Sequence, residues 1–191
     1  MIGTGISARA ALAVALLLTI GSNLMADEER RAEARMLLAE LTAENVSPSE
    51  MEQGFPGFSA RARDDVIAHF VHHPQAVTPK LLARLPYIAT DPQRPALRDL
   101  MRSHLVSEDP RLRERALYGL QALDDPRLAQ AAAGLLDDTD DRVLFGAIHI
   151  LTPQLDRHPA LGERLRAIAD RVRDQPEYEL TPKLLQSLGY R

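Results

Sequence analysis

A helix-start signal recurs along this chain at a constant interval. Thr78-Pro79, Asp109-Pro110 and Asp140-Asp141 each place a short, oxygen-bearing side chain before an apolar run, and the step from position 78 to 109 equals the step from 109 to 140. Such an oxygen can accept a hydrogen bond from a free N–H group of a helix's first turn, and a proline directly after the cap needs no N–H. Asp125-Pro126 gives a further start signal between the second and third. This repeat interval therefore predicts a helix, a tight turn and a second helix.

The first helix of the clearest copy carries an apolar stripe. Its members follow helical spacing and are Leu112, Ala116, Leu117, Leu120 and Leu123. A single helical hairpin cannot bury such a stripe, so neighbouring hairpins have to stack on it. Aromatic residues make up only 4% of the chain, and no segment alternates β-branched and polar residues over a sustained length. The pattern predicts an all-α fold of stacked helical hairpins.

Residues 109–152 also share a more specific pattern. After Asp-Pro, the first copy has Leu112-Arg113 followed by Ala116, with Leu120 on the same face, and the second copy keeps Val143 and Ala147. This pattern resembles HEAT-like repeats of the short type found in phycobilisome-lyase-related and many bacterial proteins. The resemblance implies a short right-handed α-solenoid of the HEAT/armadillo-like class, and such folds serve many unrelated functions. The second copy departs from the pattern because Leu144 replaces the arginine.

The first 26 residues have the layout of a secretory signal peptide. Arg9 precedes residues 10–20, which are apolar except for Thr19, and Ala26 is followed by an acidic stretch. We expect cleavage after Ala26 and hence an exported protein, periplasmic or secreted. An uncleaved N-terminal anchor is the alternative, although a spanning helix needs about 20 apolar residues.

Composition narrows the classes of partner. The net charge of −4 becomes −5 when the single arginine of residues 1–26 is removed, and the chain has no cysteine. Such an acidic chain is not expected to bind nucleic acid, and it would meet a membrane only through an uncleaved N-terminal segment. Without disulfides, stability has to come from packing. We expect an N-terminal helix and loop over residues 27–58 and a HEAT-like repeat domain over residues 59–191.

The strongest candidates for chemistry are Asp65, His69, His72 and His73 on one predicted helix. Their spacing could turn two or three of them the same way toward a divalent metal ion. One helix rarely supplies a complete ligand set, so a polar helix end is the preferred interpretation and no cofactor is predicted. The acidic run 137–141 lacks the glycine and distal glutamate of a helix-loop-helix calcium site, and we expect a turn there.

The stretch from Arg127 to Asp137 is rich in small residues. Either a neighbouring helix packs closely on them, or the exposed face is kept shallow so that another chain can lie across it. In the second interpretation Arg127, Gln130 and Gly134 lie on the concave side of the stack. Arg164, on the next second helix, would then extend the same partner-binding surface.

Signature motifs of common enzymes are missing from this sequence. It contains no glycine-rich phosphate loop, no Gly-x-Ser-x-Gly and no His-Glu-x-x-His. We therefore predict a non-enzymatic, exported helical-repeat protein that binds or scaffolds another protein in the cell envelope. The alternatives are a membrane-anchored assembly factor, a metal-binding protein or, from the resemblance to the repeats of bilin lyases, a lyase-type protein.

Overall fold

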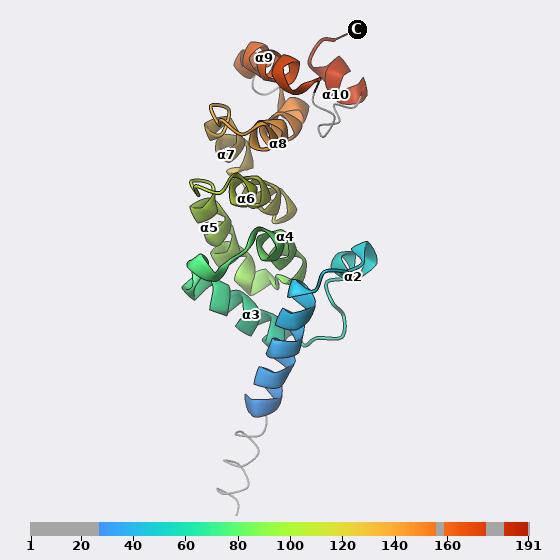
Figure 1. Cartoon of the computed structure of the whole chain (residues 1–191), viewed down its shortest axis with the longest axis vertical. Coiled ribbons are helices and arrows are strands. Elements are labelled where there is room, and N and C mark those ends of the chain that lie inside the picture. Colours follow the sequence, from blue (N-terminus) through green and yellow to red (C-terminus); the bar gives the residue numbers. More distant parts are fainter. Residues whose placement is uncertain (1–26, 156–158, 175–181, 191) are drawn as a thin grey trace, which may run out of the picture.

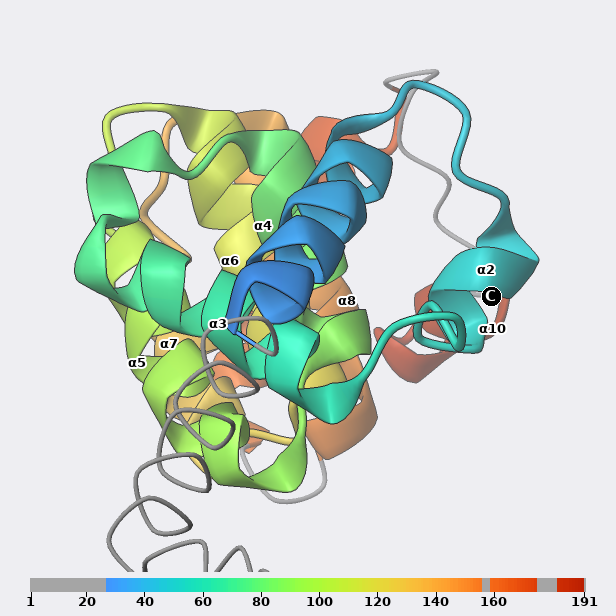
Figure 2. The ribbon, with the colours of Figure 1, turned by 90° about the horizontal axis from the view of Figure 1, so that it is seen from below.

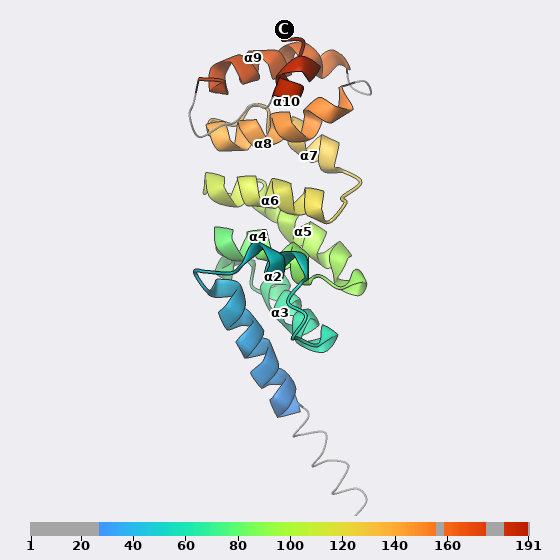
Figure 3. The ribbon, with the colours of Figure 1, turned by 90° about the vertical axis from the view of Figure 1, so that its right-hand side faces the viewer.

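The computed structural model describes residues 27–155, 159–174 and 182–190. Within these ranges every regular element is a helix, which confirms the predicted all-α class. The helices stack in layers, from the helix over residues 27–42 at one end to α9 (Gly162–Val172) and α10 (Pro182–Ser187) at the other (Figures 1 and 3). The expected signal segment lies outside the described residues. None of the described helices combines the length and apolarity needed to cross a membrane.

Two columns of helices build the middle of the stack. One column consists of α4 (Pro79–Ile88), α6 (Pro110–Ala122) and α8 (Asp141–Leu151). The other column consists of α3 (Ala60–His72), α5 (Arg94–His104) and α7 (Leu128–Gly134) (Figures 1 and 2). Within this arrangement α6 packs against α4, α5 and α8, and α7 packs against α8. Each layer therefore contacts mainly its neighbours along the stack.

Short elements connect these helices. The short helix α2 (Pro48–Glu52) follows the helix over residues 27–42 and contacts α4. Single 3₁₀ turns lie at Pro74–Ala76, Asp91–Gln93, Thr152–Gln154 and Pro159–Leu161. Phe55, in the loop after α2, is buried in the core, so this loop closes an apolar seam.

The predicted start signals act as N-caps. The side chains of Thr78, Asp109 and Asp140 each accept a hydrogen bond from an N–H group in the first turn of α4, α6 or α8. The starts of these three helices are evenly spaced along the chain, as the repeat interval predicts. Around Asp125 the outcome is different. Its Oδ1 accepts from the Arg127 N–H at 2.7 Å, but α7 is shorter than the small-residue stretch because the chain turns after Gly134.

Buried apolar side chains form two clusters along the stack. The first extends from the helix over residues 27–42 through α3, α4 and α5 to α6, and the second from α6 through α7 and α8 to α9. The predicted stripe of α6 contributes to both, with Ala116, Leu117, Leu120 and Leu123 fully buried. Leu105, Leu128 and Ala131 are partly buried and pack against both clusters. These three residues join the two halves of the core.

Arginine side chains also tie separate helices together at their ends. Arg84 of α4 donates to the carbonyls of Leu41 and Ala43 at 2.6 and 2.8 Å, and Arg98 of α5 donates to the carbonyl of Leu123 at 2.6 and 3.0 Å. The last carbonyls of a helix have no partner within it and lie at the negative end of its dipole. A guanidinium therefore supplies both the missing donor and the favourable charge.

Candidate functional site: a groove between α5 and α7

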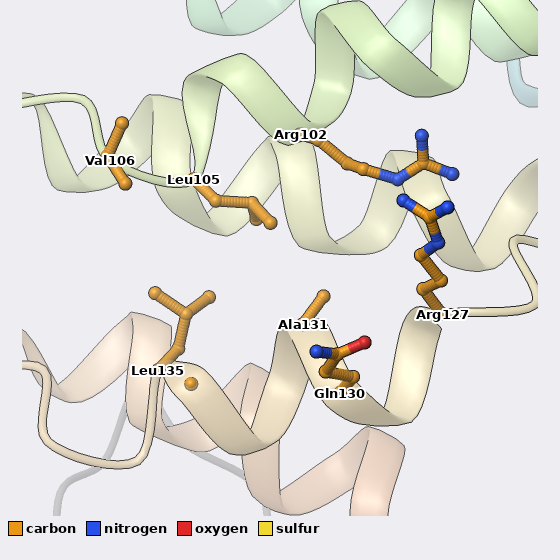
Figure 4. Close-up of a pocket in the computed structure, with 8 residues that line it drawn as sticks. Arg102, Leu105, Val106, Arg127, Gln130, Ala131 and Leu135 are labelled. Carbon is orange, nitrogen blue, oxygen red and sulfur yellow. The ribbon is translucent and has the colours of Figure 1, made fainter.

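A groove of about 360 Å³ lies between the end of α5 and the length of α7. It is lined by Arg102, Leu105, Val106, Arg127, Gln130, Ala131, Gly134 and Leu135 (Figure 4). We name this surface the α5–α7 groove. It brings together three of the four residues that the sequence places on a partner-binding face, namely Arg127, Gln130 and Gly134.

The floor and one wall of the α5–α7 groove are apolar. Leu105, Ala131 and Leu135 form the floor, and they are buried or half-buried. Val106, which follows α5, is 86% exposed, more than any other large apolar side chain in the described chain. Single exposed apolar residues are common, but one beside an apolar recess marks a place where a ligand can displace water at little cost.

Gly134 separates the two explanations offered for the small residues of α7. A Cβ atom added at Gly134 would meet no other atom within 4 Å, so packing does not require glycine here. At Gly119 of α6, by contrast, a Cβ atom would lie 2.6 Å from the sulfur of Met101. Close packing does account for Ala132, which is fully buried on the opposite face of α7. The absence of a side chain at Gly134 therefore leaves the groove open.

Two guanidinium groups point toward each other at one end of the α5–α7 groove (Figure 4). Arg102 is held by Asp99 and by Asp125, whose carboxylate is fully buried. The exposed Arg127 side chain makes no hydrogen bond or ion pair with any other described residue. Since Asp99 and Asp125 already neutralise Arg102, Arg127 is the open guanidinium at this end, and its planar fork suits a carboxylate. This end of the groove is therefore suited to a carboxylate.

Arg164, the fourth residue predicted on this surface, does not line the groove. It belongs to α9, and its guanidinium forms an ion pair with Asp137 in the turn between α7 and α8. That Arg164 extends the partner-binding surface beyond the groove stays a prediction. The chain after α8 carries α9 to the end of the stack, away from α5.

The acidic run 137–141 is the turn between α7 and α8. Asp138, only 6% exposed, accepts two hydrogen bonds of 2.7 Å from Arg113 of α6, and this pairing raises the pKa of the guanidinium. The Arg142 side chain binds Asp140 at 3.0 Å and lowers the pKa of its carboxyl. Asp138 thus fastens this turn to α6, whereas Asp140 pairs within the first turn of its own helix, α8.

The predicted histidine cluster makes contacts within its own helix. The Nδ1 atoms of His72 and His73 lie 2.7 and 2.9 Å from carbonyls one turn earlier, and the rings of His69 and His73 stack at 4.7 Å. Asp65 pairs with Arg30 at 2.9 Å. In the part of the chain that the structure describes, no three His, Cys, Asp or Glu side chains are grouped so that they could hold a metal ion.

Arg102, Leu105 and Val106 are groove residues that sequence analysis missed. They come from the end of α5, and their contact with α7 is set by the packing of two helices that are separate in the sequence. The one signal available in the sequence was Val106, an apolar residue directly before the polar run Ser107-Glu108-Asp109. No protein-family model, characterised protein or solved structure matches this chain, so the groove is interpreted from its own geometry.

Proposed function

We propose that this chain is a non-enzymatic protein-binding module built as a short, right-handed, HEAT-like α-solenoid. The even spacing of α4, α6 and α8 and their capped starts support the repeat architecture. The observation that carries the function is the α5–α7 groove, with an apolar floor and an unpaired guanidinium at one end. Stacked helical repeats present extended surfaces on which partner chains can lie.

The occupant that fits the groove is a segment of a partner protein that carries an apolar side chain beside a carboxylate. The apolar side chain would lie against Leu105, Ala131 and Leu135. The carboxylate would bind between Arg102 and Arg127, where two guanidiniums face each other. A carboxylate in this place replaces water around Arg127 with a charge-assisted hydrogen bond.

Selection of a displayed library of random peptides against the full-length chain tests this proposal. We expect enrichment of peptides with an apolar residue next to an aspartate, a glutamate or the peptide's C-terminus. Val106→Asp should abolish the enrichment, and Arg127→Ser should keep the apolar preference but lose the acidic one. Met36→Asp is a matched control, because Met36 is an exposed apolar side chain on the helix over residues 27–42. If Val106→Asp leaves the enrichment unchanged, the groove is not the site at which these peptides bind.

We further propose that the module works outside the cytoplasm, in the cell envelope or as a secreted protein. The supporting observation is the basic, apolar and small-residue layout of residues 1–26. Mass spectrometry of the protein recovered from cells tests this, since cleavage after Ala26 gives a chain that begins at Asp27. An intact N-terminus in the membrane fraction would instead support the membrane-anchored assembly factor.

A further inference from the structure

A second recess lies along the other column of helices. It has a volume of about 500 Å³ and is formed by the first turns of α4, α6 and α8, with α2 beside them. Five cationic side chains line it, and they are Lys80, Arg84, Arg111, Arg115 and Arg142. We name it the basic cleft. Its charge is opposite in sign to the net charge of the chain.

The repeat places these cations in register. Lys80, Arg111 and Arg142 are each the second residue of their helix and recur at the repeat interval. Arg84 and Arg115 are separated by the same interval and lie one turn further along α4 and α6. Cations in a helix's first turn are disfavoured by the positive end of the helix dipole. Three successive helices with a cation at this position are therefore not explained by helix stability.

Partners within the chain leave part of this charge unneutralised. Lys80 pairs with Glu44 at 2.7 Å and Arg142 pairs with Asp140 at 3.0 Å, both as partly exposed ion pairs, while Arg84 donates to neutral carbonyls. The Arg111 guanidinium has no hydrogen-bonding or ionic partner in the described ranges, and the closest carboxylate to Arg115 is that of Glu114, at 3.8 Å. Both of these arginines are exposed and lie four positions apart on α6, so they present their forks on the same side.

The spacing of the layers indicates the shape of the ligand. Packed helices lie about 8–10 Å apart, so equivalent cations in successive layers are separated by about this distance. A chain in the extended polyproline II conformation advances about 3.1 Å per residue with about three residues per turn, so carboxylates at every third position share one side and match successive layers. One phosphate group is too small to reach three layers.

We propose that the basic cleft binds an extended acidic segment of a partner protein, whose carboxylates, at about every third position, meet Lys80, Arg111 and Arg142 in turn. This binding is independent of the α5–α7 groove, because the two surfaces share no residue. Guanidinium forks favour carboxylates through paired hydrogen bonds, so the exposed forks of Arg111 and Arg115 at the middle layer fit this ligand.

Fluorescence anisotropy with labelled synthetic peptides tests the proposal on the full-length chain. One peptide carries glutamate at every third position among serine and alanine, and a second has the same composition with its glutamates adjacent. We expect the spaced peptide to bind at least tenfold more tightly than the second. Binding should weaken as salt is added, because the contacts are between exposed charges.

Matched variants locate the binding. The double variant Arg111→Ser/Arg115→Ser should bind the spaced peptide at least tenfold more weakly than the parent. The control double variant Arg35→Ser/Arg61→Ser should bind it within twofold of the parent. All four arginines are exposed, so both variants remove the same charge, and circular dichroism checks that both fold. Equal loss in both variants, or equal binding of the two peptides, would overturn the proposal. Binding of inorganic phosphate or a single-stranded oligonucleotide at these arginines, with the peptide inert, would also overturn it.

Discussion

The α5–α7 groove and the basic cleft arise from the same stack of helices in opposite ways. The groove depends on individual positions, such as the open Gly134 and the exposed Val106. The cleft depends on equivalent positions of α4, α6 and α8, because Lys80, Arg111 and Arg142 are each the second residue of their helix. In stacked helices, individual positions can create a local recess, and equivalent positions in successive layers can create a surface that runs through several layers.

The arginines of this chain fall into two groups, those that bond to other groups of the stack and those that are left open on its surface. The first group donates hydrogen bonds to backbone carbonyls or to a buried carboxylate, and it includes Arg84, Arg98 and Arg113. Arg111 and Arg127 make no such bond with any residue the structure describes. Bonded arginines are thus expected to contribute to stability, and open ones to binding.

The largest effect on stability is expected when Arg113 is replaced. Arg113→Ala leaves the carboxylate of Asp138 nearly buried and unpaired, which should cost about 3–5 kcal/mol of unfolding free energy. Chemical denaturation measures this loss. Arg111→Ala, close by on the same helix and exposed, should stay within about 0.5 kcal/mol of the parent. Similar losses in both variants would remove the distinction between bonded and open arginines.

A comparable loss of unfolding free energy is expected when a core side chain of α6 is truncated. Leu120 is fully buried in the first cluster, so Leu120→Ala should cost about 2–5 kcal/mol through lost transfer free energy and a cavity. Thermal and chemical melts report it. A melt within error of the parent would show that the repeat register of α6 is wrong.

Replacing each of two glycines with alanine should change the stability of the chain in opposite directions. Gly119→Ala pushes a Cβ atom against the buried Met101 and should destabilise the chain by about 1–3 kcal/mol. Gly134→Ala meets no atom, so it should stabilise α7 by about 0.4–1 kcal/mol through a smaller loss of backbone entropy. Paired denaturation curves measure both changes. Destabilisation by Gly134→Ala would restore the explanation that α7 is small because it packs closely.

A weaker effect is expected on the pH dependence of the unfolding free energy, through a buried histidine of α5. Burial lowers the pKa of His104 below its usual 6.5, and its Nε2 has no hydrogen-bond partner among the described residues. The unfolded chain therefore takes up a proton at this residue at a higher pH than the folded chain. Its contribution to stability should be complete above about 6.5 and should decline as pH falls through the range between the unfolded and folded pKa values. His104→Gln should remove this part of the pH dependence of the unfolding free energy between pH 7 and 5. If the pH dependence is unchanged in His104→Gln, it comes from another residue.

The smallest effect on stability is expected at Gln130. This side chain is exposed in the groove, so Gln130→Glu should leave the unfolding free energy within about 0.5 kcal/mol. The added charge lies beside the proposed carboxylate site and should weaken binding of acidic peptides selected on the groove. Binding of the spaced acidic peptide to the basic cleft should not change. A loss on both surfaces would show that they are not independent.

Local signals in the sequence determined much of the fold. The caps at Thr78, Asp109 and Asp140 act within a single helical turn, so their effect can be predicted without knowing the tertiary structure. The burial of Leu120 followed from helical spacing for the same reason. Asp125 accepts from the Arg127 N–H and pairs with Arg102, but α7 begins only at Leu128 with Arg127 as its N-cap, so the start signal at Asp125 did not predict the start of this helix.

The site could be predicted only where a single helix carries it. Gln130 and Gly134 lie four positions apart on α7, so their shared face follows from helix geometry. Arg102 and Arg164 depend on how separate helices pack. Arg102 reaches the groove from α5, whereas Arg164 is held by Asp137 in the turn that follows α7. No local pattern determines such contacts.

The junction formed by Leu105, Leu128 and Ala131 has a consequence for how the chain unfolds. In the part of the chain that the structure describes, α6 and these three partly buried residues are what the two core clusters share, so we expect the two halves to behave as separate cooperative units in amide hydrogen exchange. Leu105 and Ala131 also line the α5–α7 groove, which therefore spans the boundary between the units. A peptide bound there would contact both units, so we expect their exchange protection to rise together and the two opening events to merge into one.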